Sequence, residues 1–404
     1  MVFLGLDPTK LKKYLGLKRE FVSKEYINLN PIQRGGILTE EARKALVEFG
    51  DGYSVCDWCP PKTPRLDMVS RPPIHDFMVD LASFLNMDVV RVVTRCREAK
   101  FIIFHMLGKP GDYVVIDGLA HYTTYLAAEA AGLKIKEVPH NGYPEYKINL
   151  DAYAEKIEEV KKETGKLPVA ALLTHVDSFY GNLNDASKVA KICHEYGVPF
   201  ILNAAYTAGV MPINGKSLMV DGLVGSGHKS WAASAPTGIL ALTEELSKKI
   251  LVRSKIVGDW SGRHFPIKEL PLLGCTVMGA PIISLMASFP HVVERVKKWE
   301  EEIKKARYLV EQLEKIEGTK QLGVKPKQHT LIHVESLGFH KVAETHKRRG
   351  FFLYDELKKR KIVGIQPGLT RHFKFNVYGL TWDEIKYVAE SFLDIAKKYG
   401  LSVG

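Results

Sequence analysis

Residues 220–238 read VDGLVGSGHKSWAASAPTG, a short apolar strand that runs into a turn of small residues carrying Lys229. Small residues let the backbone approach a bound group closely, and Ser226 and His228 offer hydrogen-bond donors suited to a phosphate. A lysine in a partly desolvated, cationic site has a lowered pKa and can form a Schiff base with a carbonyl compound. A His-Lys pair alone favours an exposed loop lysine, so the interpretation depends on the rest of the chain.

From about residue 88 onward, short apolar runs alternate with helical patterns, which predicts βαβ units. The runs predicted as buried strands are 89–93, 113–116, 169–174, 199–203 and 238–242. The segments predicted as helices between them are 98–107, 124–131, 152–163 and 186–196. A left-handed residue is expected after three of these helices, at Gly108, Gly132 and Gly197. The predicted fold class is therefore α/β, with a mostly parallel central sheet flanked by helices.

The 404 residues are enough for more than one core, and three parts are predicted. Residues 1–75 form a turn-rich arm around one helix that Thr39 could cap. Residues 76–290 form the large domain. Residues 291–404 form a smaller α+β domain, which opens with a long charged helix over 292–316 and ends with a helix over 382–398.

The chain is basic, with 57 Lys and Arg against 46 Asp and Glu, a formal charge of +11. This charge favours a polyanionic partner such as a nucleic acid, because cations near phosphates release condensed counterions. A solvated lysine-rich surface explains the charge equally well. No stretch has the roughly 18 apolar residues of a membrane span, and residues 1–6 are too short for the apolar part of a signal peptide. We therefore expect a soluble cytoplasmic protein with no membrane partner.

Three further features fit a site for a phosphorylated aromatic cofactor. Asn203 ends a predicted strand, where open α/β sheets bind their ligands, and is placed to meet a ring. Cys96 and Arg97 begin a helix directly after a strand, and a helix N-terminus presents free N–H groups to a phosphate. His121 follows another strand and could stack on the ring. Each feature alone is more often a satisfied core polar group, but the four in this order are hard to explain in that way.

In this order the features resemble the fold-type I pyridoxal-phosphate (PLP) enzymes of the cysteine desulfurase and class V aminotransferase group. The resemblance implies a homodimer whose arm completes the partner's pocket. In that group an acidic residue meets the pyridine nitrogen, whereas this chain has Asn203. Charged hydrogen bonds contribute about 1.5–3 kcal/mol and neutral ones about 0.5–1.5 kcal/mol, so the electron sink is weaker by roughly one kcal/mol. Loss of a good leaving group from Cβ tolerates a weaker sink better than transamination does.

The five cysteines are an odd number without an export signal, which indicates reduced thiols rather than a disulfide framework. Cys56 and Cys59 form a C-x-x-C pair in the arm, and Cys275 lies in LLGCTVMGA. Such a pair can be a zinc half-site, a redox pair or a sulfur carrier. A second C-x-x-C is absent from the sequence, which argues against a zinc site of four cysteines. From their neighbours alone, Cys96 and Cys193 are interpreted as small buried hydrophobes.

Longer strings extend over nearly the whole chain. They are PIQRGG at 31–36, LTEEA at 38–42, DGYSVCDWC at 51–59, PPIHDF at 72–77, REAKF at 97–101, HY at 121–122, YGNL at 180–183, SGHKS at 226–230, LMASFPH at 285–291, FFLY at 351–354 and PGLTR at 367–371. These strings are similar to those of the archaeal O-phosphoseryl-tRNA:cysteinyl-tRNA synthase family. One local departure is Arg95, where that family has a glycine.

The resemblance to this family implies PLP-dependent conversion of phosphoserine on tRNA(Cys) into cysteine, by β-elimination of phosphate and addition of sulfur. Lys229 would carry PLP and remove the Cα proton, His121 would stack on the ring, and Asn203 would contact the pyridine nitrogen. The residues implied to hold the cofactor phosphate are Cys96, Arg97, Ser226, Gly227 and His228. Arg97, with Arg371 or Arg34, would neutralise the departing phosphate.

Cys56, Cys59 and Cys275 match three family cysteines that carry sulfur as a persulfide or ligate an iron–sulfur cluster. The implied substrate is phosphoseryl-tRNA(Cys), and a phosphoseryl-tRNA synthetase is a further candidate partner. The basic runs 346–349 and 358–361 either contact tRNA or form solvated helix faces.

Two alternatives remain from the sequence. A cysteine desulfurase or lyase that acts on a free amino acid would use the same cofactor without RNA. A non-catalytic tRNA-binding scaffold would keep only the fold, and an intact Lys229 in its phosphate-binding turn argues against it.

Overall fold

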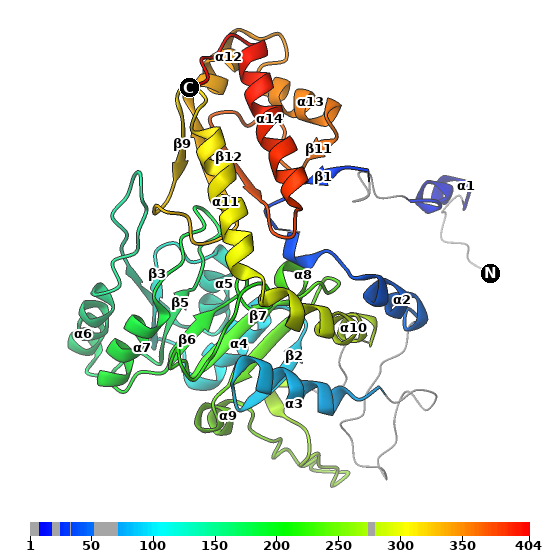
Figure 1. Ribbon diagram of the computed structural model, residues 1–404. Coiled ribbons are helices and arrows are strands. Elements are labelled where there is room, and N and C mark those ends of the chain that lie inside the picture. The colour runs from blue at the N-terminus through cyan, green and yellow to red at the C-terminus, as the bar shows by residue number, and fades with distance from the viewer. Residues whose placement is uncertain (1–7, 18–24, 33, 52–71, 274–278) are drawn as a thin grey trace.

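The structure is a computed structural model, and it describes residues 8–17, 25–32, 34–51, 72–273 and 279–404. A larger body built around a sheet forms the lower part of Figure 1, and a smaller body stands above it. The helix α11 (Trp299–Leu313) runs from one body to the other. Every helix among the described residues is too short or too polar to pass through a lipid bilayer.

The larger body contains a seven-stranded sheet in the order β2-β8-β7-β6-β5-β3-β4. The strands are β2 (Val89–Val93), β3 (Tyr113–Asp117), β4 (Lys134–Val138), β5 (Ala170–Thr174), β6 (Phe200–Asn203), β7 (Gly222–Ser226) and β8 (Gly238–Leu242). Strand β8 pairs antiparallel with β2 and β7, and the other neighbours pair in parallel. The predicted mostly parallel sheet is therefore confirmed.

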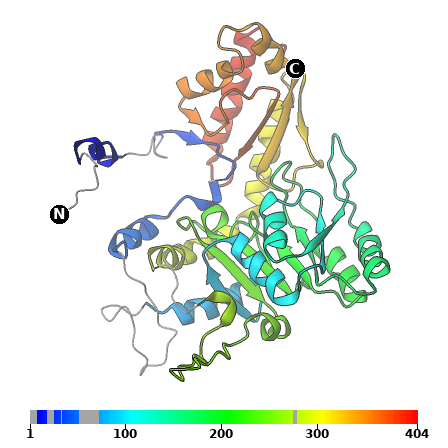
Figure 2. The ribbon, with the colours of Figure 1, turned by 180° about the vertical axis from the view of Figure 1, so that it is seen from behind.

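Helices cover both faces of this sheet. Successive side chains of a strand point to opposite faces, and the central strands are buried at every position, so both faces need to be covered. In β5, Ala171 and Leu173 pack in one core, whereas Ala170 and Leu172 pack in a second core. The helices of the first core are α3 (Ile74–Leu85), α6 (Ala152–Thr164), α7 (Ala186–Glu195) and α10 (Gly279–Val296). Those of the second are α4 (Cys96–Leu107), α5 (Tyr122–Ala130) and α9 (Glu244–Ile250). Figure 2 views the molecule from behind, from the side of this second group of helices.

Each of the strands and helices predicted in this body is present, with ends that differ by at most two residues. Gly132 and Gly197 have φ of +74° and +71°, as predicted. The prediction for Gly108 is wrong, since it ends α4 in an extended conformation with φ −111°. Strand β4 was not predicted. It lies at the sheet edge and exposes Lys134, so its sequence does not form an apolar run.

The smaller body is an antiparallel sheet in the order β12-β10-β9 with helices packed on it. Its elements are α11, β9 (Thr319–Leu322), β10 (Leu331–Ser336), α12 (Leu337–Thr345), α13 (Phe351–Lys359), β11 (Ile362–Val363), β12 (His372–Asn376) and α14 (Trp382–Lys398). The helix predicted over 382–398 matches α14. A capping box between Thr381 and Glu384 fixes where this helix begins.

The single helix predicted over 292–316 is wrong, because α10 ends at Val296 and α11 begins at Trp299. Trp299 packs with Ile303, Val210 and Tyr378 in a small cluster of its own. A sequence pattern does not show this tertiary contact. The domain border predicted after residue 290 falls inside α10, whose Val292 packs in the core of the larger body.

The described part of the arm contacts both bodies. Strand β1 (Ile27–Asn28) pairs with β11, and Leu29 is fully buried in the core of the smaller body. Thr39 caps α2 (Glu40–Glu48) by accepting a hydrogen bond from the backbone N–H of Ala42, as predicted. The arm thus connects the two bodies.

Candidate active site

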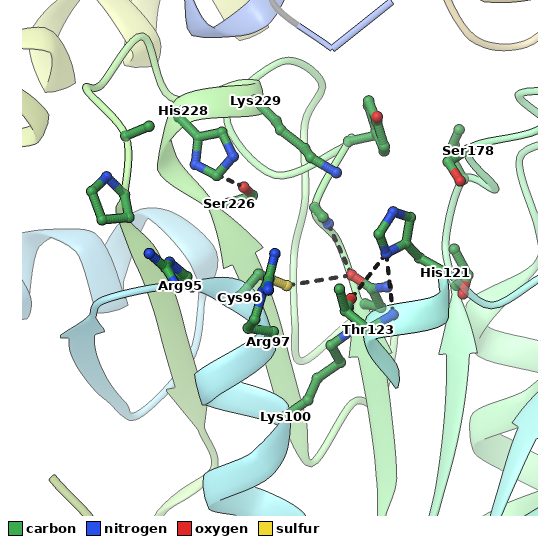
Figure 3. A pocket seen from close by; sticks show the side chains of 17 residues that line it. Arg95, Cys96, Arg97, Lys100, His121, Thr123, Ser178, Ser226, His228 and Lys229 are labelled. Carbon is green, nitrogen blue, oxygen red and sulfur yellow. Dashed lines mark hydrogen bonds between the residues drawn. The ribbon is translucent and has the colours of Figure 1, made fainter. Parts of the chain in front are cut away.

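A cavity of about 530 Å³ opens where β5, β6 and β7 end, at the carboxyl edge of the parallel strands (Figure 3). Open α/β sheets bind their ligands at this edge. The described residues that line the cavity are Arg95, Cys96, Arg97, Lys100, His121, Thr123, Thr174, Val176, Ser178, Asn203, Ala205, Tyr206, Ser226, His228, Lys229, Ala235 and Pro236. Most of the residues predicted for the site are therefore brought together.

Lys229 lies on α8 (Gly227–Ser230), a single helical turn directly after β7. Its side chain extends into the cavity in Figure 3, and its Nζ lies 4.5 Å from the ring centroid of Tyr206. The backbone N–H of Gly227 donates to the Thr237 carbonyl at 2.9 Å. A Cβ on Gly227 would lie 2.7 Å from the Thr237 Cβ, so only glycine fits this turn. The turn predicted around the lysine is therefore tightly determined by its sequence.

The lysine turn is held from behind by the arm and by α10. A Cβ on Gly36 would lie 1.8 Å from the His228 carbonyl oxygen, so the arm backbone presses directly on the turn. Arg295 of α10 is partly buried, and its guanidinium donates to the carbonyls of Gly35, Gly209 and Ser230. Three separate segments are thereby tied together next to Lys229.

The lining is strongly cationic. Arg95, Arg97, Lys100 and Lys229 contribute four cationic side chains, and no Asp or Glu is among the described residues that line the cavity. The cavity also contains the N-terminus of α4, whose first N–H groups favour an anion. The arrangement is suited to phosphate groups.

Arg95 precedes α4 with φ −158° and ψ 152°, an extended conformation that any residue adopts. The departure from glycine at this position therefore leaves the backbone unstrained. It adds a cation to the lining of the cavity.

His121 is the N-cap of α5, and its Nδ1 accepts a hydrogen bond from the backbone N–H of Thr123 at 3.3 Å. Burial and, to a smaller extent, the nearby charges of Lys229, Lys100 and Arg97 lower the pKa of His121 from 6.5 to about 4. The imidazole is therefore neutral at pH 7. A neutral ring can stack on an aromatic ligand without adding charge to it.

Asn203 is buried at the end of β6. Its Oδ1 accepts from the backbone N–H of Ala205 at 3.3 Å and from the Cys96 thiol at 3.7 Å. Desolvation raises the pKa of the Cys96 thiol, so it remains protonated and acts as a donor here rather than as a nucleophile. Among the described residues, these contacts leave the Nδ2 donor of Asn203 for a ligand.

Lys100 is a residue of the site that the sequence analysis missed. It is 1% exposed, and its Nζ donates to the hydroxyls of Thr123 at 2.9 Å and Thr124 at 2.8 Å. Burial lowers its pKa from 10.5 to about 8. Its spacing of four residues from Cys96 places both on one face of α4 and was the available signal. Tyr206, three residues after Asn203, was missed as well.

Ser226 and His228 lie at the predicted place, and the Ser226 hydroxyl is 3.5 Å from the His228 Nδ1. Arg34 and Arg371 do not line the cavity. The partly buried Arg34 donates from Nε to the Tyr378 carbonyl at 2.8 Å, which gives it a structural role. Arg371 is half exposed and lies 4.0 Å from Glu335.

The prediction for Cys56, Cys59 and Cys275 lies outside the described residues. Cys193 is fully buried in the large core, as predicted. Across residues 8–17, 25–32, 34–51, 72–273 and 279–404, no cluster of His, Cys, Asp or Glu has the arrangement of a metal site.

Comparisons with known proteins agree with this geometry. A family model described as O-phosphoseryl-tRNA(Sec) selenium transferase, SepSecS, matches residues 102–402. The O-phospho-L-seryl-tRNA:Cys-tRNA synthase of Methanopyrus kandleri is 56% identical over 393 residues, which cover 97% of this chain and 99% of the relative. The enzyme of the same name from Methanocaldococcus jannaschii is 55% identical over 388 residues, 96% of this chain and 99% of the relative.

Solved structures give the same result. A structure described as the SepCysS–SepCysE N-terminal domain complex superposes with a TM-score of 0.87 at 54% identity, over 96% of this chain and 99% of that chain. A cysteine desulfurase from Thermococcus onnurineus NA1 superposes with a TM-score of 0.73 at 18% identity, over 97% and 98% of the two chains. The second likeness shows the fold, which is that of fold-type I PLP enzymes. The high identity over nearly the full length of the first group shows that the chain belongs to the O-phospho-L-seryl-tRNA:Cys-tRNA synthase family.

Proposed function

We propose that the chain converts O-phosphoseryl-tRNA(Cys) into cysteinyl-tRNA(Cys), with PLP held on Lys229. The observation that carries the proposal is the cavity at the strand ends, where Lys229 projects among three further cations with no acidic residue in the described lining. Such a lining suits a reaction in which both the cofactor and the substrate bring a phosphate. The relatives at about 55% identity are named for this reaction.

The residues present fit PLP. A cavity of about 530 Å³ is within the range of small-molecule sites. The N-terminus of α4 with Ser226 and His228 would hold the cofactor phosphate, and the neutral His121 would cover one face of the ring.

Asn203 would meet the pyridine nitrogen with its Nδ2 donor, because its Oδ1 is occupied by Ala205 and Cys96. A donor amide suits an unprotonated ring nitrogen. PLP, when bound, supplies a sink for the electron pair left on Cα. With an unprotonated ring this sink is modest, which fits a reaction in which phosphate leaves rapidly from Cβ.

The residues of the chain supply proton transfer and charge. The Nζ of Lys229 takes the proton from Cα, the Cβ–O bond breaks with its electron pair going to inorganic phosphate, and Arg97 and Arg95 neutralise that anion. A thiolate-type sulfur then forms the new C–S bond at Cβ. The Lys229 Nζ returns the proton to Cα.

We propose that Cys56, Cys59 and Cys275 deliver the sulfur. The terminal sulfur of a persulfide on one cysteine adds to Cβ, and a second cysteine thiol attacks the resulting S–S bond and releases cysteinyl-tRNA. A cysteine disulfide is left behind, and an external thiol reductant restores it. An iron–sulfur cluster on these cysteines is the alternative. Replacing each of the three cysteines by serine should abolish sulfur addition but retain phosphate release, whereas the control Cys193→Ala should retain both steps. Visible iron–sulfur absorbance after anaerobic purification would favour the cluster.

The proposed assembly is a homodimer that acts on phosphoseryl-tRNA(Cys) in the cytoplasm. A SepCysE partner of the kind present in the related complex, and a phosphoseryl-tRNA synthetase, are further candidate partners. The basic run 358–361 contains Lys359 and Arg360, which pair with the buried Glu356, so fewer of its charges are free for RNA than the sequence indicates.

The test of this function is the substitution Lys229→Ala, with Lys216→Ala as a control because Lys216 is an exposed lysine paired with Asp88 outside the cavity. The first variant should lose both the visible absorbance of the lysine-linked cofactor and turnover of phosphoseryl-tRNA, and the second should retain both. Full activity of Lys229→Ala would end the proposal. Equal turnover of free phosphoserine would instead favour a free-amino-acid lyase.

A further inference from the structure

A second cavity, of about 730 Å³, lies between the arm and the smaller body. We propose that it binds the 3′-terminal adenosine of the tRNA substrate, the nucleoside to which an aminoacyl group is esterified. The proposal rests on the proposed function, because it concerns the same substrate. The arm contributes Asn30 and Pro31, and the smaller body contributes Tyr354, His333 and His372.

The two cavities share a wall. Lys374 lines the second cavity, and its Nζ donates to the carbonyl of Ser178 at 3.0 Å, while Ser178 lines the first cavity. Next to this contact, the Nδ1 of His333 lies 2.9 Å from the Phe179 carbonyl. An ester places the ribose directly beside the phosphoseryl group, so the nucleoside must occupy space next to the cavity of Lys229. The second cavity is in that position.

The lining has the chemistry that a nucleoside requires. Tyr354 and His372 offer rings for stacking. His333 stacks on Tyr180 at 5.3 Å and meets His372 edge to face at 5.8 Å, so it supports the ring of His372. Asn30 and Gln366 carry amides that can pair with the edge of a base. No Asp or Glu is among the described residues that line this cavity, so the phosphate preceding the terminal nucleoside meets no carboxylate there.

The position of these rings follows from the sheet. His333 of β10 is paired with Lys374 of β12, and His372 stands at the beginning of β12, so the three side chains lie on neighbouring strands. Burial lowers the pKa of His333 to about 4, which keeps its ring neutral. Among the described residues that line this cavity, Lys374 supplies the lysine charge, which can attract the RNA backbone at the shared wall.

The test uses two stable probes on the PLP-loaded enzyme. Both are phosphonate analogues of phosphoserine in which a methylene replaces the ester oxygen, so phosphate cannot leave. One is joined by an amide to 3′-amino-3′-deoxyadenosine, and the other is a methylamide without a nucleoside. The variants are His372→Ala and Tyr354→Ala. His340→Ala is the matched control, because the side chain of His340 is 41% exposed and 3.9 Å from a glutamate, against 45% and 3.7 Å for His372.

Loss of a ring that stacks on a base should weaken the nucleoside probe by roughly fivefold to a hundredfold and change the methylamide by less than about twofold. His340→Ala should change neither. Unchanged binding of the nucleoside probe in both cavity variants, or equal weakening of the two probes, would overturn the inference. An enzyme that binds neither probe would contradict the proposed function itself, which separates the two failures.

Discussion

Replacing Lys100 with methionine should leave the apoprotein at least as stable as the natural chain and weaken its affinity for PLP. Lys100 is fully buried, and within the described part of the chain its Nζ donates to the hydroxyls of Thr123 and Thr124 alone. Methionine has a similar length and no charge. The substitution therefore separates the contribution of the cation to anion binding from its contribution to folding.

The effect on stability follows from the pKa. Burial lowers the pKa of Lys100 from 10.5 to about 8, and a shift of this size corresponds to about 3 kcal/mol. Because the folded pKa lies below the unfolded one, the charge destabilises the fold below pH 8, and this cost disappears as the pH rises from about 8 to 10.5. Methionine removes the cost but leaves two hydroxyls without a donor, at about 1 kcal/mol each. The net gain at pH 7 is roughly 1 kcal/mol.

The effect on cofactor binding has the opposite sign. Unit charges within roughly 8 Å of each other interact by about 2 kcal/mol at an effective dielectric constant near 20, which corresponds to about a 30-fold change in Kd. The assay is titration of each apoprotein with PLP, together with its thermal unfolding at pH 7.

Lys327→Met is the matched control for Lys100→Met. Lys327 is also buried, its pKa is also lowered to about 8 by burial, and it lies outside the described lining of the cavity. The control should retain its affinity for PLP. Natural affinity in Lys100→Met, or an equal loss in Lys327→Met, would refute the electrostatic role of Lys100.

Three further predictions concern stability and chemistry. Arg295→Met leaves three backbone carbonyls without their donor and should lower the free energy of unfolding by roughly 3 kcal/mol or more; an unchanged thermal midpoint would contradict this. The thermal midpoint should fall as the pH drops from 6.5 to 4. Burial lowers the pKa of His175 to about 4 and that of His329 to about 3, so in this pH range the unfolded chain binds more protons than the folded one. A midpoint that does not change with pH would argue against this prediction. Asn203→Asp should protonate the pyridine nitrogen and increase abortive transamination, measured as keto-acid product; an unchanged product ratio would count against the assigned contact.

Much of the fold could be predicted because the central strands are buried on both faces. Strand β5 is buried at all five positions, so it forms an uninterrupted apolar run that a sequence pattern reveals. Strand β4 lacks this signal because it lies at the edge of the sheet. The break between α10 and α11 depends on the packing of Trp299 against Val210 and Tyr378, residues that are distant in the chain.

The site was predictable where its residues are close in sequence or end a strand. Ser226, His228 and Lys229 occupy one turn, and Asn203 ends β6. Arg34 was assigned to the phosphate because its sequence neighbours resemble the family. Its guanidinium instead bonds to the carbonyl of Tyr378, a contact that only the folded chain shows.

The most direct test of the cofactor assignment is chemical. Borohydride reduction of the PLP-loaded protein fixes the cofactor to the lysine that holds it, and peptide mass spectrometry then identifies that lysine. The pyridoxyl group should be found on Lys229. Its presence on Lys100 or Lys374 instead, or its absence from every lysine peptide, would contradict the account.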